Sequence, residues 1–132
     1  GSSIWIGAVG GILIVYGIEL LNYLRIDDPV GAFPVHGIVG VWGTLAVGLF
    51  GQAALGSPAD GLFFGGGFGQ LGIQILGVVA CLGFVAIVMA IVFKAIDASV
   101  GLRVSRETEL RGLDVDEHGL ESYSGFQIFT TD

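Results

Sequence analysis

Three long apolar stretches constrain the fold of this chain more than any other feature. They run from about residue 4 to 24, from 32 to 53 and from 71 to 95. A bilayer core about 30 Å thick is crossed by about 20 helical residues, whereas a membrane strand needs only about 9–11. The composition agrees, because 53% of the residues are hydrophobic and only 13% are charged. The sequence therefore predicts an all-α integral membrane protein with three transmembrane helices.

The basic residues predict how these helices are oriented. Arg25 follows the first stretch, whereas the connection 52–70 contains no Lys or Arg. The remaining basic residues end or follow the third stretch: Lys94, Arg103, Arg106 and Arg111. Because Lys and Arg concentrate in cytoplasmic segments, we expect the 25–31 loop and the tail to be cytoplasmic.

The chain divides by composition into two parts. We expect a transmembrane region over residues 1–97 and a cytoplasmic C-terminal tail over residues 98–132. From Asp97 onward the chain carries −5 of its net charge of −7, which disfavours nucleic acid as a partner. Cys81 is the single cysteine, so no disulfide within the chain is possible. The chain starts at Gly1 without Met or a charged segment, and we expect it to be an internal piece of a longer protein.

His36 is the candidate functional residue, because it stands alone in the apolar segment 33–43. A charged residue at membrane depth costs roughly 2.5–3.5 kcal/mol and usually faces a pore or a partner. The pKa of histidine, about 6.5, lets small environmental changes switch its charge near neutrality. Two interpretations are open: proton handling or polar-solute passage, and a neutral histidine bonded to a backbone carbonyl between packed helices.

Small residues in the apolar stretches predict helix packing. Gly7 and Gly11 form a GxxxG pattern, and Gly37, Gly40 and Gly43 recur every three residues, with Ala46 next. Such residues let membrane helices approach closely, although a pore wall is the alternative for the glycines near His36.

Two acids and one loop complete the membrane region. Glu19 lies near the end of the first stretch, where we expect a structural role. Asp97 lies where the last helix leaves the membrane, and we expect it to be solvated. The glycine-rich segment 56–67 predicts an irregular external loop whose phenylalanines anchor at the interface.

The tail has turn signals rather than membrane character. Ser105 followed by Glu107 and Glu109 predicts a helix N-cap with acids in its first turn, so we expect a short helix over 106–111. A second turn is expected over 114–119, with His118 exposed. A solvated disordered tail is the alternative.

These motifs together resemble the ammonium transporter (Amt/Mep/Rh) family. The sequences DDPVGAFPVHG over 27–37 and WGTLAVGLF over 42–50 resemble the family's penultimate helix. GLRVS over 101–105, then Glu109, GLD over 112–114 and HG over 118–119 resemble its C-terminal cytoplasmic segment. The resemblance implies the last three helices of an eleven-helix fold, with ammonium or ammonia as the transported substrate.

The resemblance also implies a site and partners. His36 matches the second histidine of a pore pair, and the pore candidates around it are Phe33, Gly37 and Gly40. The implied regulatory tail residues are Gly101, Arg103, Gly112 and Asp114. The family forms homotrimers in the lipid bilayer, and PII-type signal proteins regulate many members from the cytoplasmic face. No cofactor and no enzymatic activity are implied.

One residue departs from the family pattern, and several functions stay open. Pro34 stands where glycine or a small polar residue is expected. His36 also lies only about 6 Å along the helix from Ala32, at about 1.5 Å per residue.

An ammonium sensor, a Rhesus-type gas channel and a proteolipid-like subunit built on Glu19 are the alternatives to a transporter.

Overall fold

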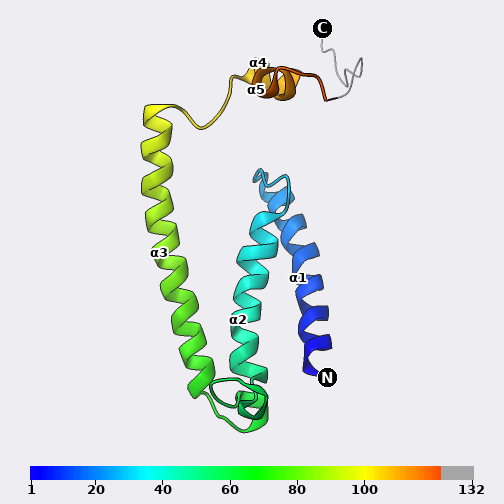
Figure 1. Ribbon diagram of the computed structural model, residues 1–132, viewed down its shortest axis with the longest axis vertical. Helices are drawn as coiled ribbons and strands as arrows, with labels where there is room; N and C mark the ends of the chain where they lie inside the picture. The colour runs from blue at the N-terminus through cyan, green and yellow to red at the C-terminus, as the bar shows by residue number, and fades with distance from the viewer. Residues whose placement is uncertain (123–132) are drawn as a thin grey trace. The chain divides into compact units, whose positions relative to one another are not determined.

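In the computed structural model, which describes residues 1–122, every regular element is a helix. The elements in chain order are α1 (Ser2–Leu24), η1 (Phe33–Ile38), α2 (Val39–Phe50), η2 (Ala53–Leu55), η3 (Leu62–Phe64), α3 (Gly69–Ser99), α4 (Arg106–Arg111) and α5 (Asp114–His118) (Figure 1). The chain divides into two compact units inside α3, the first ending at Ala86 and the second beginning at Ile87. The predicted all-α class is confirmed.

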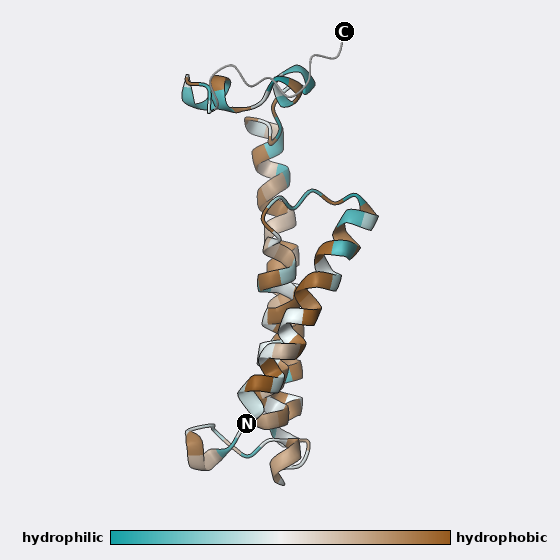
Figure 2. Ribbon diagram, turned by 90° about the vertical axis from the view of Figure 1, so that its right-hand side faces the viewer, coloured by the Kyte–Doolittle hydropathy of each residue, from teal (hydrophilic) through white to brown (hydrophobic). Residues whose placement is uncertain are grey.

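Three helical segments are long and apolar enough to cross a membrane, and they confirm the three predicted spans. They are Ser2–Leu24, Phe33–Phe50 and Gly69–Ser99. Figure 2 shows hydrophobic colouring along these segments and more hydrophilic colouring in the turn between α1 and η1 and in the tail. The second span ends at Phe50, earlier than expected, because Gly51 leaves the helical conformation at ψ 144°. The third has 31 residues, and at about 1.5 Å per residue it exceeds a bilayer core of about 30 Å.

α1 and α2 lie side by side because α1 presents glycines to α2 (Figure 1). Gly10 and Gly17 are buried, and a Cβ on Gly10 would lie 3.5 Å from Val39 Cγ1. Next to this contact, the indole Nε1 of Trp42 donates a hydrogen bond of 2.9 Å to the carbonyl oxygen of Ile6. A small-residue surface and one polar bond thus hold the two helices together, as is usual in membranes.

Within residues 1–122, only some of the predicted packing residues are in contact with another helix. Gly7 and Gly11 are exposed, and an added Cβ would meet nothing within 4 Å at either position. On the second span Ala46 is buried, but Gly40 and Gly43 are exposed. A spacing of three residues cannot keep one face, because each step of about 100° leaves the row about 60° short of a full turn.

The connection between α2 and α3 is an irregular loop, as predicted, with two short 3-10 turns, and internal hydrogen bonds hold it together. The backbone N–H of Gly61 donates to the carbonyl of Gly51 at 2.8 Å, and Asp60 Oδ1 accepts from the N–H of Ala53 at 2.8 Å. A Cβ on Gly66 would lie 1.7 Å from the carbonyl oxygen of Asp60, so the close approach requires glycine. The exposed Phe63 ring packs on Phe50, with centroids 5.1 Å apart.

The tail forms the short helix predicted over 106–111, and the turn predicted over 114–119 is the short helix α5. Ser105 Oγ accepts from the N–H of Thr108 at 3.2 Å at the start of α4, which ends before Gly112. α5 ends before Gly119, whose φ is 69°, and His118 is exposed as expected. Residues 123–132 of the predicted tail lie outside the described residues.

Candidate functional site

The turn that precedes His36 is held by one carboxylate. α1 ends at Leu24, Arg25 after it has a left-handed backbone conformation, and the chain then passes through Asp27-Asp28-Pro29 in the predicted 25–31 loop. The two oxygens of Asp28 accept hydrogen bonds from the N–H groups of Ala32 at 2.8 Å and Phe33 at 2.9 Å. These bonds, that of Phe33 first, lower the pKa of Asp28 because they favour its charged form. Asp28 therefore fixes where the second span begins.

His36 lies in a π-helical turn, which the sequence did not predict. The turn is η1 (Phe33–Ile38), and the N–H of Val39 donates to the carbonyl of Pro34, five residues back. An α-helix closes each bond over four residues, so the turn around His36 is wider. Single π-helical turns are rare and often occur at functional sites. The expectation of a regular helix from residue 32 is wrong at this turn.

The side chain of His36 belongs to an exposed row along η1 and α2. Five exposed residues follow one another at intervals of three or four: Phe33, His36, Gly40, Gly43 and Val47. We call this row the histidine stripe. Residues at such intervals share one side of a helix. Ile38, Val39 and Trp42, in contrast, contact α1, so the stripe faces away from α1.

The structure brings three of the four predicted pore residues together. Phe33, His36 and Gly40 belong to the histidine stripe, whereas Gly37 is half-buried. A Cβ on Gly37 would lie 2.9 Å from Phe33 Cδ2, so the Phe33 ring lies over Gly37. Gly37 therefore leaves room for the phenylalanine ring. At Gly40 an added Cβ would meet nothing within 4 Å, which leaves open space beside the imidazole.

This geometry bears on the two interpretations of His36. The residue is exposed, and within residues 1–122 its imidazole makes no hydrogen bond to a backbone carbonyl. A histidine packed and bonded between α1 and α2 is thus not what these residues form. An exposed imidazole that lies beside an aromatic ring and a glycine can exchange a proton with a small solute that reaches the histidine stripe.

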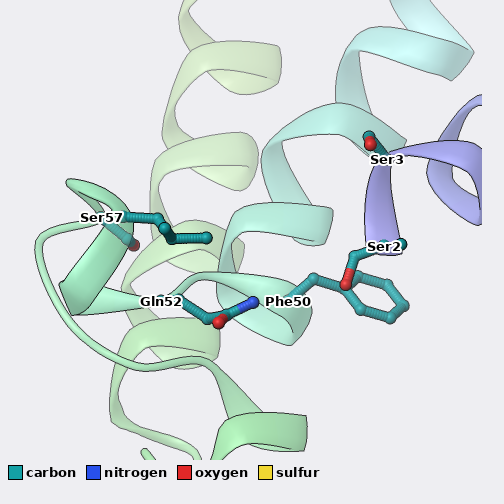
Figure 3. A pocket seen from close by; sticks show the side chains of 7 residues that line it. Ser2, Ser3, Phe50, Gln52 and Ser57 are labelled. Atoms are coloured by element: carbon teal, nitrogen blue, oxygen red, sulfur yellow. The ribbon is translucent and has the colours of Figure 1, made fainter.

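Other polar features of the membrane region do not form a comparable site. A pocket of about 280 Å³ lies at the opposite end of the α1–α2 pair from His36 (Figure 3). Its lining has hydroxyl, amide and apolar groups: Gly1, Ser2, Ser3, Phe50, Gln52, Leu55 and Ser57. Glu19 is exposed on α1, and the expected structural hydrogen bonds to it are absent among residues 1–122. In the same residues no group of three His, Cys, Asp or Glu side chains is placed to hold a metal ion.

The predicted tail residues shape the tail itself. Gly101 and Gly112 adopt positive φ angles of 80° and 98°, which glycine tolerates best. Arg103 forms an ion pair with Glu109. Asp114 Oδ2 accepts from the N–H of Ser122 at 2.8 Å, and this bond lowers the pKa of Asp114.

Asp97 also has a contact that the sequence did not predict. Its Oδ1 accepts a hydrogen bond of 3.2 Å from the N–H of Leu102. Asp97 is exposed, as expected, but it also helps the chain to turn after α3.

Sequence reasoning missed two residues that build the candidate site. Asp28 was interpreted as part of a turn, although an Asp just before an apolar helix is a capping signal. Gly17 had no signal of its own, because nothing in a single sequence says which glycine of α1 meets the second span.

Comparison with known proteins identifies relatives along almost the whole chain. The Ammonium Transporter Family matches residues 1–123. An ammonium transporter of Bacillus subtilis is 38% identical over 124 residues, which are 92% of this chain and 30% of the relative. Ammonium transporter Amt2 of Archaeoglobus fulgidus is 34% identical over 137 residues, covering 99% of this chain and 29% of the relative.

The similarity is to part of each relative. The chain spans less than a third of the length of these two curated proteins. No solved structure matches the chain. The three apolar helices and the tail as far as residue 123 fall inside the family match. The chain belongs to the ammonium transporter family.

Proposed function

We propose that this chain contributes the His36 side of a pore that carries ammonium or ammonia across a membrane. The observation that carries the proposal is the position of His36, on an open stripe of an apolar helix in a chain of the ammonium transporter family. Both similar proteins described above are named ammonium transporters. The histidine stripe supplies one titratable group, the imidazole of His36. Its other members are apolar side chains and glycines.

The chemistry follows from the cost of desolvating a cation. An ammonium ion that leaves water for an apolar pore loses its hydration, which is expensive unless the charge is paired or removed. Transfer of one proton from ammonium leaves ammonia, which is neutral and crosses the stripe at lower cost. The imidazole of His36 can accept that proton and pass it on, because histidine is a common side chain for proton transfer. We propose a second histidine, from outside this chain, as its partner.

The remaining parts of the proposal concern the whole protein. We propose that the chain is the C-terminal portion, the last three of eleven helices, and that residues 98–132 form a cytoplasmic regulatory tail. We further propose a homotrimer whose tail meets a PII-type signal protein. Apolar side chains in the described tail support a docking role, because Val100, Leu110 and Leu120 are all exposed.

The test is transport by the complete protein with His36→Ala. We expect uptake of radiolabelled methylammonium to fall to background in cells that lack other ammonium transporters. His118→Ala is the matched control, because His118 lies in the tail, and it should retain uptake. Unchanged ammonium-driven currents with His36→Ala would remove the proposed proton transfer.

Purified protein in liposomes separates the alternative functions. Ammonium flux with current supports proton-coupled transport, whereas flux without current supports a Rhesus-type gas channel. Specific ammonium binding without any flux would support the sensor. Inhibition by a carbodiimide that depends on Glu19 would support the proteolipid-like alternative.

A further inference from the structure

The side chain of His36 is directed by a contact two residues away from it. Gly17 of α1 is buried, and both Pro34 and Ile38 lie against it. A Cβ added to Gly17 would lie 3.0 Å from Pro34 Cβ and 2.8 Å from Ile38 Cδ1. We call these three residues the Gly17 seat. The seat holds both ends of a segment whose middle residue is His36.

This arrangement dictates the direction of the histidine. Two residues along a helix turn a side chain by about 200°, so a residue midway between two that face α1 faces away from it. Pro34 is fully buried, whereas His36 is exposed. The carboxylate of Asp28 fixes the start of the same turn through Ala32 and Phe33. Asp28 thus fixes the start of the turn, and the contacts of Pro34 and Ile38 with Gly17 hold it on either side of His36.

The two contacts in the Gly17 seat differ in how far they can yield. Ile38 Cδ1 is the end of a flexible side chain and can move to another rotamer. Pro34 Cβ belongs to a ring whose φ is locked near −65°, so moving it moves the backbone. Any group that grows from Gly17 therefore displaces the turn mainly through Pro34.

We infer that Gly17 and Pro34 are positioning residues, which direct the imidazole of His36 onto the histidine stripe by fixing the π-helical turn. This inference rests on the proposed function for its importance to transport, but the direction of the side chain can be measured without transport. Neither residue touches the proposed solute. Both act through the backbone of residues 34–38.

The experiment measures the reactivity of a cysteine at position 36. In the complete protein, with Cys81 and any other cysteine replaced by serine, His36→Cys is labelled with N-ethylmaleimide in detergent. Gly40→Cys is measured in parallel as the control position, because it lies on the same stripe beyond the π-helical turn. We then add Gly17→Ala or Pro34→Ala to each background.

We expect either added substitution to slow labelling at position 36 by roughly tenfold, which corresponds to about 1.4 kcal/mol, and to leave position 40 unchanged. Gly10→Ala is the matched control on α1, because its Cβ would lie at an ordinary 3.5 Å from Val39 Cγ1 and should alter neither rate. With His36 in place, Gly17→Ala should also change the pH profile of transport, whereas Gly10→Ala should not.

Three results would overturn the inference: equal losses at positions 36 and 40, no loss at either, or no labelling at position 36 with Gly17 and Pro34 intact. Equal losses would mean a general packing defect. If the labelling results hold but the complete protein carries no ammonium, the proposed function fails while the positioning role stands. If Pro34→Ala does not fold, Gly17→Ala alone decides.

Discussion

The α1–α2 pair and α3 are built from similar residues, yet they pack very differently. In the most apolar 18-residue window, 17% of residues are buried in α1 and likewise in the span Phe33–Phe50, but none are buried in α3. Both regions contain glycines. On α1, Gly10 meets α2 and Gly17 meets η1, whereas an added Cβ at Gly77 or Gly83 of α3 would meet nothing within 4 Å.

The difference shows what holds membrane helices together. Lipid tails are as apolar as leucine, so hydrophobicity alone does not drive one helix onto another. α1 meets the second span, Phe33–Phe50, through Gly17 opposite Pro34 and Ile38 of η1, and the indole N–H of Trp42 in α2 donates to the Ile6 carbonyl. The most apolar window of α3 has no buried residue among those that the structure describes.

The largest expected effect on stability comes from a substitution at Gly48, where α3 contacts α2. A Cβ there would lie 2.6 Å from Leu71 Cα, a backbone atom that cannot move alone. We expect Gly48→Ala to destabilise the complete protein by about 1–3 kcal/mol, the usual cost of overpacking. Thermal unfolding in detergent measures this, with Gly43→Ala as the stability control, since its Cβ meets nothing within 4 Å. Equal stability of both variants would mean that α3 is not seated on Gly48.

Asp28→Ala should give the next largest loss, because it removes both acceptors that hold the start of η1. The pKa of Asp28 is below its ordinary value of 3.8 in the folded chain. Its contribution is therefore complete above that ordinary pKa and is lost as the pH falls through the lowered one. Unfolding temperatures measured from neutral to acidic pH should converge for the two proteins in acid. Asp28→Asn, which keeps one acceptor oxygen, should lose less stability at neutral pH than Asp28→Ala. If the unfolding temperatures of Asp28→Ala and the unsubstituted protein differ by the same amount at every pH, the role assigned to the Asp28 carboxylate is contradicted.

Gly77→Ala sharpens the comparison from the side of α3. Glycine costs a helix about 1 kcal/mol relative to alanine, and the new methyl group meets no atom of residues 1–122. We expect a gain in stability of at most that size, in contrast to a loss for Gly17→Ala on α1. Unfolding of both variants in the same detergent measures the pair. A clear loss for Gly77→Ala would reveal a close partner of α3 from outside this chain.

The smallest expected effect belongs to the polar bond between α1 and α2. Trp42→Phe removes the donor to the Ile6 carbonyl, and interhelical hydrogen bonds in membranes contribute about 0.6 kcal/mol on average. Trp5→Phe is the control, because Trp5 is 70% exposed. The difference between the two variants in unfolding free energy measures the bond. If both variants have the same unfolding free energy, the hydrogen bond contributes nothing measurable, and the glycine contacts alone hold the two helices together.

Much of the fold could be predicted because its signals are local. Length and apolarity marked the three spans, and Ser105, Gly112 and Gly119 marked the ends of the tail helices. The candidate site was predicted less well. The π-helical turn and the exposed row that contains Phe33, His36 and Gly40 were not predicted. Which side of the second span is exposed depends on its contacts with α1, such as that of Pro34 with Gly17.

The sequence by itself determined which segments are helical, where the membrane spans lie, and which family the chain resembles, because these depend on neighbouring residues. The tertiary structure alone decided that Gly10 and Gly17, rather than Gly7 and Gly11, contact the second span, Phe33–Phe50. It also decided that His36 faces away from α1. The physical reason is that glycine carries no side chain, so its role is set by the surface that approaches it.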